Sequence, residues 1–133
     1  MTLEKFPFFG KLDAQAHDFL KTHLKPITAP QDTLLFEEGD ICDGVLFLND
    51  GEIEVYRTKD DEKKVLYRVE PGNQCIVNVA STLSQTKAIA SATTITDIQG
   101  FLLDMYSLRE LARNSFAYQE YIFGLYRVDF LDE

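Results

Sequence analysis

The side chains best suited to chemistry in this 133-residue chain are two cysteines and two histidines. Cys75 follows a Pro-Gly turn, where its thiol could serve in redox chemistry or touch a ligand, although a free cysteine more often packs as a small apolar side chain. Cys42 and Cys75 are not at the spacing of a CxxC metal or redox motif. His17 and His23 lie in one expected helix at a separation that does not suit two metal ligands. These four residues therefore predict neither a metal centre nor a disulfide framework.

No arrangement typical of an enzyme accompanies them. The sequence has no nucleophile paired with a base, no two carboxylates that mark a shared site and no Walker-type glycine loop. A jelly-roll enzyme of the cupin type would need clustered histidine and glutamate ligands, and the turn sequence EGDICDG contains no histidine. We therefore predict that the protein is not an enzyme, and we predict no cofactor and no metal.

The elements that would position any site form a β domain flanked by helices. Asp13 is a suitable N-cap for a first helix, which is expected to end before Pro26. Across residues 33–104, short apolar runs are separated by turn signals about every 8–12 residues, which favours an antiparallel sandwich or jelly roll. Segment 75–83 fits either a strand or a short helix, and the helical period returns from Met105. The strands are expected to enclose five apolar side chains: Leu35, Phe47, Ile53, Val55 and Leu66.

Composition limits the partners of the chain. Its length is that of one ordinary domain, and 45% hydrophobic residues are enough for a core. The formal net charge of −9 opposes binding to nucleic acid phosphates or to an anionic membrane surface by this chain alone. The sequence shows neither the pattern of a signal peptide nor a transmembrane run. We therefore expect one domain over residues 1–133, in the cytoplasm and without membrane contact.

A spaced set of residues in the stretch GDICDGVLFLNDG resembles the first signature of the cyclic-nucleotide-binding domain of Crp/Fnr bacterial transcription regulators. The set comprises Gly39, Asp40, Cys42, the apolar run 45–48 and Gly51. Four consecutive large apolar residues indicate a strand buried on both sides. The resemblance implies a double-stranded β-helix, that is a jelly-roll barrel, with an N-terminal helix and a long C-terminal dimerisation helix. It also implies three turn glycines: Gly39, Gly51 and Gly72. A generic β-sandwich with coincident glycines is the alternative.

The second signature of that family, which holds the cyclic nucleotide, is not matched. In the family, a Gly-Glu pair near the start of a short helix and an arginine before the next strand hold the ribose and the cyclic phosphate. Segment 73–94 has no glycine, the glutamate position falls on Val77 or Asn78, and the arginine position falls on Ala88. Lys87 is one residue away and is no bidentate substitute for arginine. The scaffold is therefore expected without tight binding of cAMP.

An effector pocket is still expected where the resembled family holds its nucleotide. Its polar wall, which also includes Ser84 and Thr86, could suit an unknown small neutral or weakly anionic effector, or could be the exposed surface of a loop. The candidate pocket residues are Cys75, Val77, Asn78, Ser81, Thr82, Lys87 and Ala88.

The last segment predicts a helix over residues 115–133 with two apolar faces. One line consists of Phe116, Phe123 and Phe130, and the other of Tyr118, Tyr121, Leu125 and Val128. A helix that is apolar on two faces must be covered on both. One face can pack on the β domain and the other needs a partner. In the resembled family this helix is the dimer interface, which implies a homodimer.

Taken together, these features favour the effector-sensing and dimerisation domain of a Crp/Fnr-type transcription regulator. Such a protein would contact DNA only through a domain missing from this chain. The alternative is a stand-alone small-molecule-binding or protein-interaction domain without DNA-binding activity.

Overall fold

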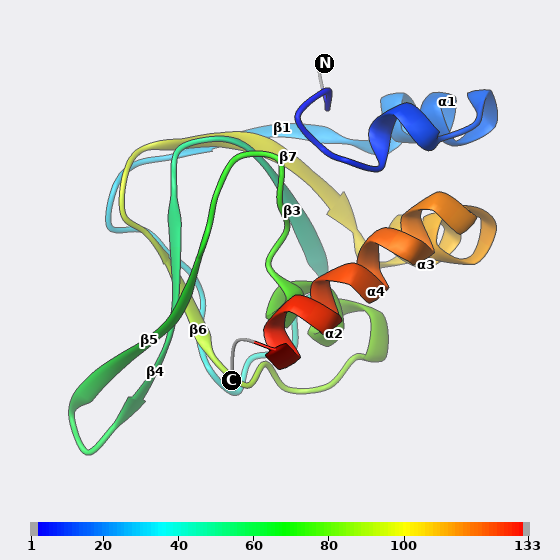
Figure 1. The fold of residues 1–133 in the computed structure, drawn as a ribbon. Coiled ribbons are helices and arrows are strands. Elements are labelled where there is room, and N and C mark those ends of the chain that lie inside the picture. The colour runs from blue at the N-terminus through cyan, green and yellow to red at the C-terminus, as the bar shows by residue number, and fades with distance from the viewer. Residues whose placement is uncertain (1–2, 132–133) are drawn as a thin grey trace.

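The computed structural model of the protein describes residues 3–131, with side chains described through Leu125. Figure 1 shows the helices gathered on one side of the strands. In chain order the elements are η1 (Phe9–Lys11), α1 (Ala14–His23), β1 (Lys25–Ala29), β2 (Leu34–Phe36), β3 (Gly44–Asp50), β4 (Ile53–Lys59), β5 (Glu62–Val69), α2 (Ile76–Ser84), β6 (Ser91–Thr94), β7 (Ile98–Asp104), α3 (Met105–Asn114) and α4 (Phe116–Leu131).

The strands form two antiparallel sheets, which together we call the roll. One sheet has the order β1-β7-β3 and the other the order β2-β6-β4-β5. The chain leaves the first sheet twice. It passes from β1 to β2 and back to β3, and then from β3 through the turn that contains Gly51 to β4, returning between β6 and β7. The β4–β5 hairpin extends away from the helices (Figure 1).

The expected closed barrel is wrong, because the two sheets are not joined into one hydrogen-bonded cylinder. β1 and β3 are the edges of the first sheet, and β2 and β5 are the edges of the second. Register shifts interrupt the ladders between Leu48 and Asp50 and between Leu34 and Phe36, and such bulges bend a strand away from its partner. The coarser expectation of a mainly β fold with flanking helices is confirmed.

Strand β3 is buried on both faces, as its apolar run predicts. Val45 and Phe47 belong to a cluster shared with the helices, which we call the helical core. Leu48 belongs to a second cluster between the two sheets, which we call the roll core. Leu46 is half-buried against the roll core. The first sheet is therefore a middle layer between the helices and the second sheet.

The roll core contains Ile53 and Val55 as expected, and Leu35 is half-buried beside it, whereas Phe47 is buried on the other face of the first sheet, in the helical core. Leu66 is an exception, because it is 39% exposed. The pairing explains this difference. The register of β4 and β5 passes from Tyr67 directly to Val65, which leaves Leu66 as the extra residue of a bulge.

The sequence around α1 predicts the start of the helix correctly but not the start of the first strand. Asp13 caps the helix as predicted, since its Oδ1 accepts a hydrogen bond from the Ala16 N–H at 2.8 Å. The strands, however, begin at β1, before residue 33. Pro26 lies inside β1, which is an edge strand, where a missing N–H is tolerated. The ambiguous segment 75–83 is helical, since it contributes most of α2.

The segment before α1 is part of the core although it has no helical or strand period. Leu3, Phe6 and Phe8 are at most 2% exposed. The Phe6 ring lies edge-on to Phe47 with ring centroids 5.5 Å apart, and the Phe8 ring lies edge-on to Tyr118 at 5.2 Å. Such aromatic pairs add to the burial of the rings themselves. The N-terminal segment thus ties the first sheet to α4.

Three glycines have positive φ angles: Gly39 at +97°, Gly51 at +93° and Gly72 at +90°. A Cβ atom at Gly51 would overlap the backbone oxygen of Asp97, and one at Gly72 would overlap that of Lys5. At Gly39 no atom lies within 4 Å of the position of a Cβ. Gly39 therefore needs glycine for its φ angle alone, whereas Gly51 needs it for both φ and space.

We expect Gly51→Ala to lower the free energy of unfolding more than Gly39→Ala, and Gly10→Ala to have the smallest effect. A left-handed backbone costs a residue with a Cβ about 1–2 kcal/mol, and only Gly51 adds overlap with a backbone atom. Gly10 has an unstrained φ and open space, so it is the control. Urea unfolding followed by circular dichroism measures the three changes. Equal losses of free energy of unfolding at Gly39 and Gly51 would show that the overlap of the added Cβ with the Asp97 oxygen costs nothing.

Candidate functional site

Helix α2 carries most of the residues expected to line an effector pocket. It follows the turn at Gly72 and begins after Cys75, and its end is marked by Gln85 in the left-handed conformation. Six of the seven candidate residues are buried, and Lys87 is exposed. Lys87, the one cation among the candidates, is therefore the one that is not buried.

The amide of Asn78 and the hydroxyl of Thr82 bind the backbone at the start of β3. Asn78 Oδ1 accepts from the Leu46 N–H at 3.1 Å, and Asn78 Nδ2 donates to the Gly44 carbonyl at 2.9 Å. The Thr82 hydroxyl lies 3.0 Å from the same carbonyl. Buried backbone groups need such partners. These side chains therefore fasten α2 to β3, and the expected polar wall faces a strand of the protein.

The other polar candidates are engaged in the same way. Ser81 Oγ accepts from the Cys42 N–H at 2.9 Å and donates to the Thr86 carbonyl at 2.7 Å, which joins α2 to the segment before β3 and to the turn that follows α2. Lys87 forms an isolated bridge with Ile41. Ala88 is 4% exposed in the roll core. No guanidinium takes the place that the resemblance gives to arginine.

A cavity of about 30 Å³ lies between the sheets and the start of α2. It is lined by Leu35, Phe36, Leu46, Leu48, Ile53, Val69, Cys75, Asn78 and Ala92. Its volume is about that of one water molecule in the liquid. Two of the seven candidates, Cys75 and Asn78, line this cavity. The strand residues that form the rest of it were missed, although the inward positions of alternating strands were the signal that could have found them.

Gln74, which sequence reasoning missed, is 3% exposed and joins three elements. Its Oε1 accepts a hydrogen bond from the Tyr118 hydroxyl at 2.7 Å, and its backbone N–H donates to the Tyr121 oxygen at 2.9 Å. Its Nε2 donates to the Leu46 carbonyl at 3.3 Å. Burial raises the pKa of Tyr118 and of Tyr121, so both phenols stay protonated. We call Gln74 with these two tyrosines the Gln74 hub.

The hub lies next to the cavity. Leu46, whose carbonyl the hub binds, lines the cavity, and so does Cys75, which follows Gln74 in the chain. The Cys75 sulfur is 3.4 Å from the Tyr67 hydroxyl and is buried, so it belongs to the packed wall. Cys42 is buried as well.

Helix α4 shows which of its two apolar lines meets the body of the protein. Tyr118 is fully buried, Tyr121 and Leu125 are half-buried, and Phe116 and Phe123 are 74% and 72% exposed. Ile122, which belongs to neither expected line, is also buried. Val128 and Phe130 lie outside the residues whose side chains are described. The phenylalanine line is thus the outward face of α4.

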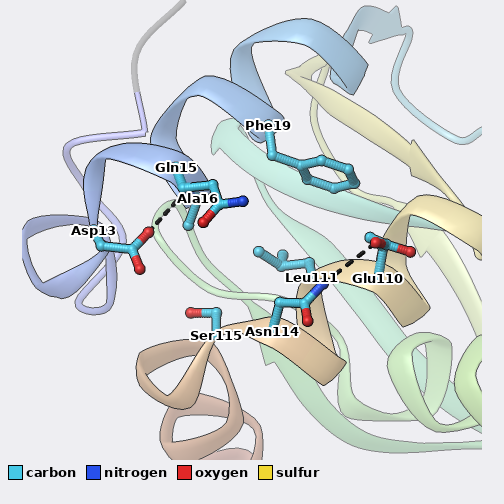
Figure 2. Close-up of a pocket in the computed structure, with 8 residues that line it drawn as sticks. All are labelled: Asp13, Gln15, Ala16, Phe19, Glu110, Leu111, Asn114 and Ser115. Carbon is cyan, nitrogen blue, oxygen red and sulfur yellow. Dashed lines mark hydrogen bonds between the residues drawn. The ribbon is translucent and has the colours of Figure 1, made fainter.

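A second, larger cavity of about 100 Å³ lies between α1 and α3 (Figure 2). Its lining comprises Asp13, Gln15, Ala16, Phe19, Glu110, Leu111, Asn114 and Ser115. Asp13 caps α1, Ser115 caps α4, and Asn114 donates to Glu110 at 3.3 Å. The two carboxylates attract cations, whereas the two helix N-termini attract anions. This cavity therefore favours no class of ligand.

Among residues 3–131, no group of three or more histidine, cysteine, aspartate or glutamate side chains is placed to hold a metal ion. No helix in the described part of the chain is long and apolar enough to cross a membrane.

Comparison with known proteins identifies relatives of the fold. The catabolite activator protein of Thermus thermophilus is 20% identical with a TM-score of 0.80, over 95% of this chain and 59% of that one. A putative regulator of the crp/fnr family from Eubacterium rectale is 17% identical with a TM-score of 0.81, over 96% and 60%. The regulatory domain of Toxoplasma gondii PKA, crystallised with cAMP, is 19% identical with a TM-score of 0.72, over 82% and 41%. No curated protein sequence matches.

The chain spans at most about three fifths of these three solved chains, and at such identities the likeness shows the fold alone. A family match covers residues 26–115, which is more than half of the sequence, and carries the description cyclic nucleotide-binding domain. The expected resemblance to a cyclic nucleotide-binding domain with the fold seen in Crp/Fnr regulators is confirmed, and the chain belongs to the cyclic nucleotide-binding domain family.

Proposed function

We propose that this chain is the effector-sensing and dimerisation domain of a Crp/Fnr-type transcription regulator whose effector is not cAMP. The observation that carries the proposal is the Gln74 hub. Leu46 and Cys75 line the cavity, and Gln74 binds both Leu46 and the two tyrosines of α4. A ligand that moves the cavity wall would therefore move groups that hold α4.

The chemistry of the roll argues against cAMP as the ligand. A buried cyclic phosphate needs backbone N–H donors and a bidentate cation. Ala88 stands at the arginine position, and Lys87 is exposed. The cavity of about 30 Å³ has no charged residue in its lining, whereas sites for small organic ligands typically measure about 300–1,000 Å³. We infer that the roll keeps the family scaffold without the family's anion site.

The DNA contact of such a regulator would be made by a part of the whole protein outside this chain. The net charge of −9 supports this division, because a DNA-binding surface must be basic. The match of this chain to about 60% of two regulator chains is compatible with the same division.

The outward face of α4 is proposed as the dimer interface. Phe116 and Phe123 are large apolar side chains that nothing within the described residues covers. Burial of each would stabilise a pair by roughly 1.5–3 kcal/mol. Gly124, next to Phe123, has no atom within 4 Å of the position of a Cβ, so a partner helix could approach there. The alternative function, a stand-alone binding domain, would use the same face for another protein.

The first prediction is that cAMP and cGMP do not bind tightly. Isothermal titration of the chain with nucleotide up to about 1 mM is expected to show no saturable heat, since each missing charge-assisted contact removes roughly 1.5–3 kcal/mol. The Toxoplasma gondii PKA domain, which was crystallised with cAMP, is the positive control. A dissociation constant in the low micromolar range would contradict the absence of an anion site.

The second prediction concerns the α4 face. The parent chain is expected to sediment as a dimer at about 100 µM, and Phe123→Glu is expected to yield monomer with unchanged β-sheet circular dichroism. Leu125→Glu, on the inward side, should instead lower stability. Ile89→Glu is the matched control, because Ile89 is 66% exposed outside α4. A monomeric parent would favour the stand-alone alternative.

The third prediction tests the hub. Tyr118→Phe keeps the buried ring but leaves Gln74 Oε1 without its donor, so the free energy of unfolding should fall by about 1–3 kcal/mol. Tyr106→Phe is the matched control, since Tyr106 is 77% exposed and its change should stay within about 0.5 kcal/mol. If urea unfolding shows equal changes in the free energy of unfolding for the two substitutions, the Gln74 hub does not link the cavity to α4.

A further inference from the structure

We infer that the effector of the roll is an uncharged, predominantly apolar small molecule that binds in an enlarged form of the cavity beside β2. This inference rests on the proposed sensing function and names the class of ligand for the same cavity.

The lining of the cavity selects against charge. Its members are apolar side chains of the strands, together with Cys75 and Asn78. Both ends of the Asn78 amide are engaged, with the Leu46 N–H and the Gly44 carbonyl. A charged ligand would lose its hydration there without a partner in the lining. An apolar ligand has no strong hydration to lose there and removes further apolar surface from water.

The surroundings of the cavity oppose anions in particular. Glu37 and Glu38 directly follow Phe36, which lines the cavity. Arg57 lies 3.5 Å from the Glu38 carboxylate and is therefore paired with it. The Glu37 N–H binds the carboxylate of Asp40, which adds a third acidic side chain to this turn. A nucleotide, a phosphate or a carboxylate would approach against these charges.

Strand β2 is the wall best able to move. It has three residues, forms an edge of its sheet, and its register with β6 shifts between Leu34 and Phe36. Leu34 is 51% exposed, and Leu35 and Phe36 are half-buried. The opposite wall, α2, is fixed to β3 by Asn78 and its neighbours. A ligand larger than the present 30 Å³ would therefore be admitted by displacement of β2.

The test uses three small molecules that share one ring and differ in charge: toluene, benzoate and benzylammonium at neutral pH. Each is titrated into the methyl-labelled chain and followed by NMR. Toluene is expected to shift the methyl signals of Leu46, Leu48 and Ile53 in a saturable way. Benzoate and benzylammonium are expected to bind at least about tenfold more weakly, because the lining has no counter-charge for either.

Variants locate the site. Ala92→Val adds two methyl groups to the lining and is expected to weaken toluene binding at least about fivefold. Ala112→Val is the matched control in α3, outside the roll, and should leave toluene binding unchanged. Should Ala92→Val disturb folding, Leu35→Phe adds volume to the lining from its half-buried rim, and weaker toluene binding is again expected.

Several results would overturn the inference. They are the absence of toluene-dependent shifts up to its solubility limit, equal affinity for benzoate, and shifts at Leu111 in the α1–α3 cavity in place of Leu46. The outcome is separable from that of the proposed function. If toluene binds but the Gln74 side-chain amide signals do not change, the inferred class of ligand is supported and sensing through α4 is contradicted. Tight cAMP binding that competes with toluene would contradict both.

Discussion

Burial of β3 on both faces is the constraint on which the other elements depend. A strand with Val45 and Phe47 toward the helices and Leu48 toward the roll cannot slip by one residue, because the slip would exchange its two faces. The N-terminal segment packs on one side through Phe6, and α2 binds the start of the strand through Asn78. Contacts with β3 therefore set the positions of Gln74, Asn78 and Thr82.

The same strand joins the cavity to the Gln74 hub. Leu46 contributes its side chain to the cavity and its carbonyl, at the free edge of the first sheet, to Gln74. Gln74 in turn holds Tyr118 and Tyr121 of α4. Buried polar groups of this kind need their hydrogen bonds intact, because a group that loses its partner is left unsatisfied. Among the elements that line the cavity, β2 is the shortest and lies at the edge of its sheet.

Sequence patterns predicted features that depend on local backbone chemistry. The turn glycines, the Asp13 cap and the two-sided strand are of this kind, because φ angles, capping and alternation are encoded by neighbouring residues. Features that depend on contacts between distant segments were not predictable in this way. The sequence placed Asn78 at the pocket but gave no sign that its amide binds Gly44, and Gln74 carries no local signal of its contact with Tyr118. Phe6 lacked a periodic pattern, and the bulge at Leu66 depends on the partner strand.

There is a physical reason why the turns of the fold can be present without an anion-binding site. The glycine turns need only backbone freedom, so they can persist whatever the cavity contains. An anion site is different, because its donors and cation are poorly satisfied when the ligand is absent. A lining such as Leu48, Ile53 and Val69 packs well when empty and stabilises the fold by burial alone. A domain of this kind packs well with its cavity empty, and any ligand would have to compete with the existing packing of β2. The response to an effector would depend on how much apolar surface the ligand buries, since the lining offers it no charge to pair with.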